Sequence, residues 1–155
     1  MEDIKLVYVP EFMEWDISFE EGDLVRDLGL ETSVLLSLFS DRRASVDDHV
    51  DDITDLRGWW GDIITQGTPL IGSKLWLLQR QKTTNEVLGR AKQYIEEALE
   101  WMIDDGVCKD ITVTTERVGD PGKDVLAFSI KILKNDETSF AMKFDDLWSA
   151  QYTVF

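Results

Sequence analysis

The sequence predicts an α+β fold in which two or three helices pack on an antiparallel sheet. A long amphipathic helical pattern occupies the middle of the chain, and three alternating apolar segments follow it. Hydrophobic residues make up 43% of the 155 residues, which suffices for one buried core. Because helices that precede a run of strands are typical of α+β domains, we expect the long helix to lie on the sheet.

Residues 1–30 are expected to form strands or an arm. The segments Ile4 to Val9 and Met13 to Phe19 flank Pro10, and the second alternates apolar and polar residues. This pattern fits a half-buried hairpin or an extended arm, followed by a turn in EEGDLVRDLG (20–29). Residues 31–155 are expected to form a single α+β domain with a C-terminal tail.

Three segments predict helices. The first, ETSVLLSLFS, begins with Thr32 or Ser33 as N-cap, and a polar loop at 41–56 follows it. The second, IGSKLWLLQRQK (71–82), has Ser73 as cap. The third begins with capping-box spacing at Thr83 and Glu86 and ends at Gly106. Its apolar stripe consists of Val87, Ala91, Tyr94, Ile95, Ala98, Leu99 and Met102.

The region after Gly106 predicts a three-stranded antiparallel meander with one apolar face. Its inward residues are Ile111, Val113 and Thr115, then Leu126, Phe128, Ile130 and Ile132, then Phe140, Met142 and Phe144. The tail DDLWSAQYTVF carries five further large apolar residues. We expect it to pack, either on its own domain or on a partner.

Composition excludes several classes of protein. The formal net charge of -15 argues against nucleic-acid binding, because phosphates need compensating Lys and Arg. Residues 1–56 carry 16 acids against 4 bases, so the acidic field belongs to the front of the chain.

The single cysteine, Cys108, permits no internal disulfide and is expected to be a small buried hydrophobe. No apolar run approaches the ~18 residues of a membrane span, and no signal-peptide pattern is present, so we expect a cytoplasmic protein with no membrane partner.

No catalytic, cofactor or metal site is expected. Glycosidases need paired carboxylates, one of them in an apolar pocket, but Glu97 and Glu100 fall opposite the helix's apolar stripe. The cluster DDHVDD (47–52) lacks calcium-loop spacing, and nothing marks a nucleophile as partner of its His49, the only histidine. Phosphate-binding glycine motifs are absent.

The stretch GWWGD (58–62) instead indicates packing and protein partners. Its Trp59 and Trp60 either fill the junction between helices and sheet or present an aromatic anchor, with one ring in the core and the other at an interface. Nearby, Arg42 and Arg43 are expected to pair with Asp41, Asp47 or Asp48, the alternative being a partner's carboxylate. The structural and interface candidates are Arg42, Arg43, Trp59, Trp60, Trp76, Trp101 and Trp148.

Four blocks together resemble one protein family. These are SLFSDRRA (37–44), RGWWGD (57–62), IGSKLWLLQRQK (71–82) and EEALEWMIDDG (96–106). In order and spacing they resemble the small baseplate protein of Mu-type contractile-tailed bacteriophages and prophages, a relative of the T4-type wedge protein once labelled lysozyme-like. The resemblance covers residues 34–115.

This resemblance implies a virion structural protein of the tail baseplate, assembled in the host cytoplasm and without enzymatic activity. It implies several symmetric copies, about six, that dock on the larger wedge protein. In T4-type relatives the corresponding subunit also seeds the tail sheath. Free edges of the strands at Ile4 to Val9 and Phe140 to Phe144 would suit assembly by strand addition.

Two other functions compete with this one. An acidic mimic of DNA that inhibits a nucleic-acid-binding protein would suit the net charge, but residues 57–155 carry 15 acids against 12 bases. A peptidoglycan glycosidase would follow the lysozyme-like label, but no acid pair supports it.

Overall fold

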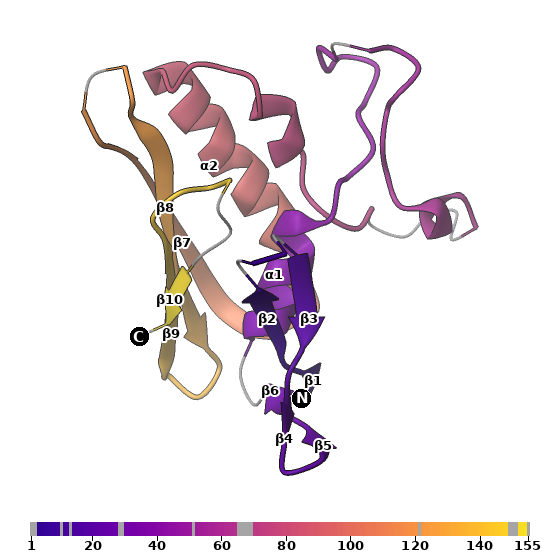
Figure 1. Cartoon of the computed structure of the whole chain (residues 1–155), viewed down its shortest axis with the longest axis vertical. Helices are drawn as coiled ribbons and strands as arrows, with labels where there is room; N and C mark the ends of the chain where they lie inside the picture. Colours follow the sequence, from indigo (N-terminus) through magenta and orange to yellow (C-terminus); the bar gives the residue numbers. More distant parts are fainter. Residues whose placement is uncertain are drawn as a thin grey trace.

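A computed structural model describes residues 3–9, 11–12, 14–27, 30–50, 52–64, 70–120, 122–148 and 152–154. Helices pack on one face of a C-terminal antiparallel sheet, and two segments project from this body (Figure 1). The expected α+β fold class is confirmed.

The sheet contains four strands where the sequence indicated three. Strands β7 (Cys108–Val118), β8 (Val125–Lys134) and β9 (Ser139–Phe144) form the expected meander, and β10 (Tyr152–Val154) pairs with the outer edge of β9. The sheet order is therefore β10-β9-β8-β7. The sequence led us to expect a free edge at β9, but β10 covers that edge. The short β10 was missed because three residues are too few to show alternation.

One face of the sheet builds the core. Register places Phe128 opposite Phe144 and Ile130 opposite both Val113 and Met142. These residues therefore share one face, as the alternation predicted. The rings of Phe128 and Phe144 stack with centroids 4.4 Å apart, and both are fully buried. Burial of each such ring stabilises the fold by roughly 1.5–3 kcal/mol.

The long helix, α2 (Asn85–Leu99), covers this face, and its predicted stripe is buried. Its N-cap is Thr84, whose hydroxyl accepts from the Val87 N–H, so the expected capping box at Thr83 is wrong by one residue. The Thr83 hydroxyl donates instead to the Asp124 carbonyl in the β7–β8 turn. A short continuation, α3 (Trp101–Asp104), has Asp105 as its C-cap, and Gly106 follows with a positive φ of 69°. The expected C-cap at Gly106 is therefore one residue too late.

The other two predicted helices begin or wind differently from expectation. Helix α1 (Glu31–Phe39) starts before Thr32, and neither Thr32 nor Ser33 is its N-cap. The buried Asp27 carboxylate accepts the Thr32 N–H at 2.8 Å and so satisfies a free donor of the first turn. The segment at 71–82 forms only a single 3-10 turn, η2 (Leu75–Leu78), which buries three leucines in the common hydrophobic core.

The N-terminal strands form a two-stranded ribbon. Strand β2 (Leu6–Val9) pairs with β3 (Glu14–Ile17), β1 (Asp3–Ile4) with β6 (Arg26–Asp27), and β4 (Phe19–Glu20) with β5 (Asp23–Leu24). Residues 23–27 were expected in a turn but lie mostly in strands, since only Glu21 and Gly22 make the tight turn. Pro10 and Met13 lie outside the described residues.

The C-terminal tail packs on its own domain. Leu147 is fully buried, and its N–H donates to the Leu126 carbonyl at 2.8 Å. Burial and then the nearby Glu31 carboxylate raise the pKa of the Tyr152 phenol, which donates to Glu31 Oε2 at 3.3 Å. Of the two alternatives for the tail, the described residues support packing on the chain itself.

Two smaller expectations concern membranes and Cys108. Within the described ranges, no helix has the length and apolar character to cross a bilayer. Cys108 is buried at the start of β7, as expected, and burial followed by the Asp110 charge raises the pKa of its thiol.

Candidate protein-interaction site

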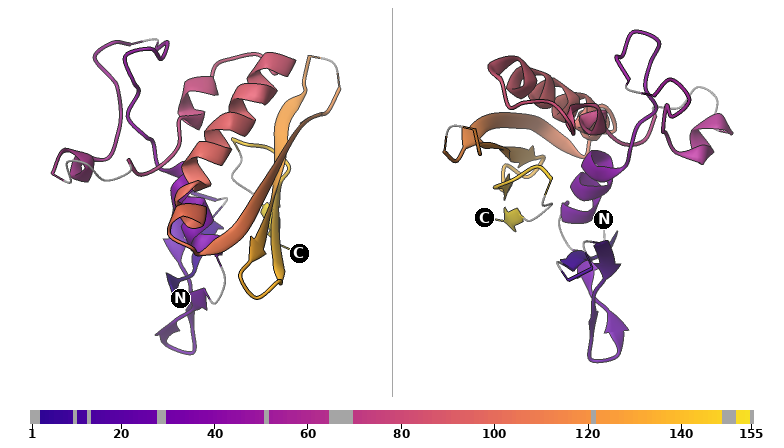
Figure 2. Two further views of the ribbon diagram at one scale, coloured as in Figure 1. Left: turned by 180° about the vertical axis from the view of Figure 1, so that it is seen from behind. Right: turned by 45° about the horizontal axis from the view of Figure 1, so that its top comes forward.

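Five of the seven predicted interface residues gather around one projecting segment. The chain leaves α1 at Ser40. The described residues 41–50 and 52–64 run outward, and residues 70–73 lead back to η2. Figures 1 and 2 show this segment standing clear of the helices and sheet, with the turn η1 (Trp60–Ile63) at its outer part. We call the described residues 41–64 and 70–72 the aromatic lobe.

Backbone hydrogen bonds centred on Ser73 fix the base of the aromatic lobe. The Ser73 N–H donates to the Ser40 carbonyl, and the Arg42 N–H donates to the Ser73 carbonyl, both at 2.9 Å. The Ser73 hydroxyl, with the residue 2% exposed, donates to the Leu38 carbonyl at 2.5 Å. Ser73 therefore ties the returning chain to the end of α1. Its hydroxyl also accepts the Leu75 N–H at 3.2 Å at the start of η2, although the N-cap position of that turn is Lys74 and not Ser73 as expected.

Trp76 and Arg57 form the second attachment of the aromatic lobe. The half-buried Trp76 indole Nε1 donates to the Arg42 carbonyl at 2.8 Å, and the Arg57 guanidinium lies 4.5 Å from the indole ring centroid. Arg57 Nη1 also pairs with Asp41 Oδ2 at 2.6 Å. A cation on an indole face stabilises by about 0.5–2 kcal/mol, so Trp76 acts from the body to hold the lobe in place.

A third attachment joins the loop before Asp51 to the body. Lys74 Nζ lies 2.7 Å from Asp48 Oδ2 and donates to the Ser45 hydroxyl at 2.9 Å. Burial by itself raises the pKa of the Asp48 carboxyl, but hydrogen bonds from Lys74 and Ser45 and the Lys74 charge outweigh it. The pKa of Asp48 therefore lies below its ordinary value.

The expected carboxylate partners of Arg42 and Arg43 are wrong. Arg42 Nη2 donates to the Leu70 carbonyl at 2.7 Å, and Arg43 Nη1 donates to the Arg57 carbonyl at 3.5 Å. Asp41 and Asp48 instead pair with Arg57 and Lys74. Both arginines thus bind backbone carbonyls at the lobe base.

The tryptophan pair lies wholly on the surface. Trp59 is 41% exposed and Trp60 70%, and their rings contact each other with centroids 5.4 Å apart. The expectation that one ring is core is wrong, because the chain bends into η1 at Trp60 and does not continue as an extended strand. Gly61 allows this arrangement, since a Cβ there would lie 2.1 Å from the Trp59 ring.

Large apolar side chains are concentrated on the aromatic lobe. Those with high exposure are Val46, Ile53, Trp59, Trp60, Ile64, Leu70 and Ile71. Exposed apolar groups in such number mark an interaction surface, and tryptophans are among the residues that contribute most to protein binding. The sequence offered a weak signal for Val46 and Ile53, namely isolated apolar residues in an otherwise polar loop.

The remaining two candidates, Trp101 and Trp148, lie outside the aromatic lobe. Trp101 is half-buried beside the core, and its Nε1 donates to the Ser37 hydroxyl at 3.0 Å. Trp148 is exposed next to buried Leu147 and lines a hollow of about 100 Å³ together with Trp76 and Arg57. The structure therefore brings Trp148 to the lobe base but leaves Trp101 with the helices.

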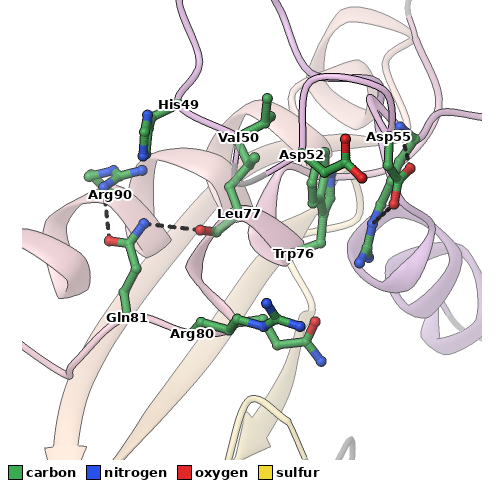
Figure 3. A pocket seen from close by; sticks show the side chains of 11 residues that line it. His49, Val50, Asp52, Asp55, Trp76, Leu77, Arg80, Gln81 and Arg90 are labelled. Carbon is green, nitrogen blue, oxygen red and sulfur yellow. Dashed lines mark hydrogen bonds and ion pairs between the residues drawn. The ribbon is translucent and has the colours of Figure 1, made fainter.

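A cleft of about 690 Å³ separates the aromatic lobe from η2 and α2 (Figure 3). His49, Val50, Asp52 and Asp55 line it from the lobe, whereas Leu77, Arg80 and Arg90 line it from the body. Arg90 Nη1 donates to Gln81 Oε1 at 3.0 Å, and Gln81 Nε2 donates to the Leu77 carbonyl at 3.0 Å. Its mixture of opposite charges and amides suits polar contacts with a protein.

Two observations on the described residues bear on glycosidase and metal chemistry. The carboxyl groups whose pKa moves, Asp48, Asp52 and Asp136, have it lowered, whereas a glycosidase general acid needs a raised pKa. Glu97, one acid considered from sequence, accepts a hydrogen bond from Gln93 on the outer side of α2. No group of three metal-binding side chains occurs in the described part of the chain.

Comparison with known proteins gives concordant matches. The family model described as Phage protein GP46 matches residues 30–139, which include the aromatic lobe, α2 and most of the sheet. Baseplate protein gp46 of Escherichia phage Mu is 45% identical over 104 residues, covering 66% of this chain and 70% of that protein. Mu-like prophage FluMu protein gp46 of Haemophilus influenzae is 34% identical over 136 residues, covering 88% and 91% of the two chains.

Proposed function

Because this chain belongs to the Mu-type phage baseplate protein family, we propose that it is a structural subunit of a contractile-tail baseplate that docks on the larger wedge protein. It works by binding, without catalysis. Several copies, about six, assemble in the host cytoplasm before the tail is complete.

The aromatic lobe is the observation that carries the proposal. It presents two adjacent tryptophans, and its base is fixed by Ser73 and by the Arg57–Trp76 contact. A surface that is already ordered loses little conformational entropy on binding, so more of the contact energy appears as affinity. We therefore assign docking on the wedge protein to this lobe.

Sheath seeding, the finer part of the proposal, is supported by the sheet. Strand β7 is eleven residues long and pairs only with β8 among the described residues, so its other edge has free N–H and C=O groups. A neighbouring strand can complete such an edge. The β9 edge that the sequence suggested is covered by β10. The two edge strands of this sheet are therefore β10, with three residues, and β7, with eleven, so β7 offers the longer edge for strand addition.

Co-expression with the larger wedge protein of the same phage tests the docking proposal. Trp60→Ala should weaken co-purification by about 30-fold, because a binding hot spot contributes roughly 2 kcal/mol or more. Stability of the isolated chain should stay within about 0.5 kcal/mol, since the ring is exposed. Ile103→Ala on α3 is the matched control, because Ile103 is 43% exposed and distant in sequence from the lobe.

Two outcomes bear against the proposal. Equal co-purification of the Trp60→Ala and Ile103→Ala variants would remove the lobe from the wedge interface. Absence of any complex between the unmodified chain and the wedge protein would remove the docking function itself.

The DNA-mimic alternative gains no support from the fold. A mimic needs acids spread along one face, but the described residues of the acidic segments 3–27 and 41–62 project at opposite ends of the molecule (Figure 1). The glycosidase alternative needs a carboxyl group with a raised pKa. The described carboxyl groups with a shifted pKa, which are Asp48, Asp52 and Asp136, all have a lowered one.

A further inference from the structure

The N-terminal ribbon, defined as the described residues of 3–27, has an apolar face that begins on the body of the domain. Antiparallel register places Tyr8 opposite Trp15 and Leu6 opposite Ile17, on one side of the ribbon. Trp15 contacts Phe39 and Tyr152, with ring centroids 5.9 and 6.1 Å away. This half of the apolar face is therefore covered by the chain itself.

The same face continues past the body without cover. Beyond Leu6 and Ile17, Phe19 lies opposite Leu24, and Phe19 is 62% exposed. Ile4 and Ile17 are also exposed beside it. Figures 1 and 2 show β4 and β5 projecting away from the helices and sheet, at the opposite end of the molecule from the aromatic lobe.

Contacts with α1 hold the ribbon in this outward position. The Thr32 hydroxyl donates to the Ile4 carbonyl at 2.9 Å, while the Thr32 N–H donates to Asp27 Oδ2. Lys5 Nζ lies 3.7 Å from Glu31 Oε2. The exposed apolar face is thus held away from the core in a fixed position, where it could bind another surface at low entropic cost.

Charges around the exposed end indicate the chemistry of the partner. A hollow of about 200 Å³ is lined by the apolar residues Ile4 and Leu24 and by the charged residues Asp3, Asp23 and Arg26. Oδ1 of Asp3 accepts the Ile4 N–H, and Oδ1 of Asp23 accepts the Leu24 N–H, both at 2.8 Å. The Oδ2 atoms of Asp3 and Asp23 have no partner among the described residues. A Lys or Arg stem would cover the apolar lining while its charged head meets the two carboxylates.

We propose that the ribbon end docks on an apolar socket with a basic rim on a neighbouring protein of the particle. Phe19 enters the socket, and a Lys or Arg of the rim occupies the hollow between Asp3 and Asp23. A second copy of this chain is a poor occupant, because residues 3–27 carry eight acids against two bases and like charges repel.

This second surface makes the subunit a bridge between two neighbours. The ribbon end and the aromatic lobe point in different directions, so one small site cannot take both. The expected division of the chain into an arm at 1–30 and a domain at 31–155 fits this role and stays a prediction.

Photo-crosslinking in assembled tails identifies the occupant directly. Tails are produced with p-benzoylphenylalanine in place of Phe19, or in place of Trp60 as the separate test of the lobe, and the crosslinked peptides are sequenced. The position-19 adduct should join this chain to a different protein, at an apolar peptide that contains Lys or Arg. The position-60 adduct tests wedge docking independently, so each proposal can fail alone.

Charge reversal tests the hollow. The double variant Asp3→Lys/Asp23→Lys should lower incorporation of the subunit into tails by about tenfold. The matched control, Glu11→Lys/Glu14→Lys, changes net charge equally at the other end of the ribbon and should lower it less than about twofold. Circular dichroism and urea unfolding of both variants establish that they fold.

Three results would overturn the proposal. The first is a position-19 adduct that joins two copies of this chain or reaches an acidic peptide. The second is absence of any adduct from assembled tails. The third is an equal effect of the two charge reversals on incorporation. In that case only the net charge of the ribbon would matter, and the hollow between Asp3 and Asp23 would not bind a specific basic residue.

Discussion

Alanine at Gly72 tests whether the chain closure at Ser73 fixes the aromatic lobe. Gly72 has a φ of 92°, and a Cβ there would lie 2.3 Å from the Ser40 carbonyl oxygen. That same oxygen accepts the Ser73 N–H. The alanine methyl therefore cannot be accommodated unless the chain segments separate and this hydrogen bond lengthens or breaks.

The expected destabilisation follows from two costs. A left-handed backbone conformation costs an L-residue roughly 1–2 kcal/mol. Loss of the hydrogen bond adds about 0.5–1.5 kcal/mol. Gly72→Ala should therefore lower the free energy of unfolding by about 2–3 kcal/mol.

Gly89→Ala provides the matched control with the opposite sign. Gly89 lies on the exposed side of α2, and a Cβ there would meet no atom within 4 Å. Because alanine is a better helix former, this substitution should raise the free energy of unfolding by about 0.5–1 kcal/mol. The two alanine variants should thus differ by about 3 kcal/mol, or roughly 6–12 °C in Tm.

Urea unfolding followed by far-UV circular dichroism measures both variants in parallel, and calorimetry gives the Tm. Limited proteolysis reports on the lobe, which should be cleaved faster in the Gly72→Ala variant. If both variants unfold within 0.5 kcal/mol of each other, or if proteolysis is unchanged, the closure at Ser73 does not fix the lobe as argued.

Three further predictions concern the core, the lobe attachment and the cysteine. Phe144→Ala should cost about 3–5 kcal/mol in urea unfolding, because it leaves a cavity beside Phe128, and an effect below 1 kcal/mol would contradict the stacked core. The lowered pKa of Asp48 contributes stability that is present above its unfolded pKa and is lost as pH falls through the folded value. An Asp48→Asn variant should therefore lose less stability on acidification below about pH 4 than the unmodified chain, and parallel curves would disprove the Lys74 pairing. The buried Cys108 thiol should react with a disulfide reagent only slowly until urea unfolds the chain, and rapid native reaction would contradict its burial.

Periodic segments of the sequence were sufficient to predict their own structure. The stripe from Val87 to Leu99 specified the buried side of α2, and the alternation at Leu126 to Ile132 specified the inward face of β8. In such segments local geometry repeats, so each residue's face follows from its position. The errors occurred at the ends of these elements. The N-cap of α2 is Thr84 and not Thr83, and the Thr83 hydroxyl bonds to the distant Asp124 carbonyl instead.

The contacts of the candidate site did not follow from the sequence, and the choice of its residues as an interface stays a prediction. In GWWGD the sequence leads us to expect one buried ring, but both tryptophans are exposed. Arg42 and Arg43 were expected to pair with acids, whereas Arg57, sixteen residues beyond Asp41, makes that ion pair. The loop has no periodicity, so the choice among several nearby cations is made by how the chain closes at Ser73.

By itself the sequence determined the α+β class, the buried faces of the long helix and meander, and the four blocks that indicate the baseplate family. Only the tertiary structure decided that β10 covers β9, that the tryptophan pair projects on a fixed lobe, and that the ribbon carries its apolar face beyond the body. The physical reason is the distance along the sequence over which each kind of information acts. Hydrophobic periodicity acts between residues a few positions apart, whereas a strand of three residues, a loop or a projecting ribbon is placed by contacts between distant segments.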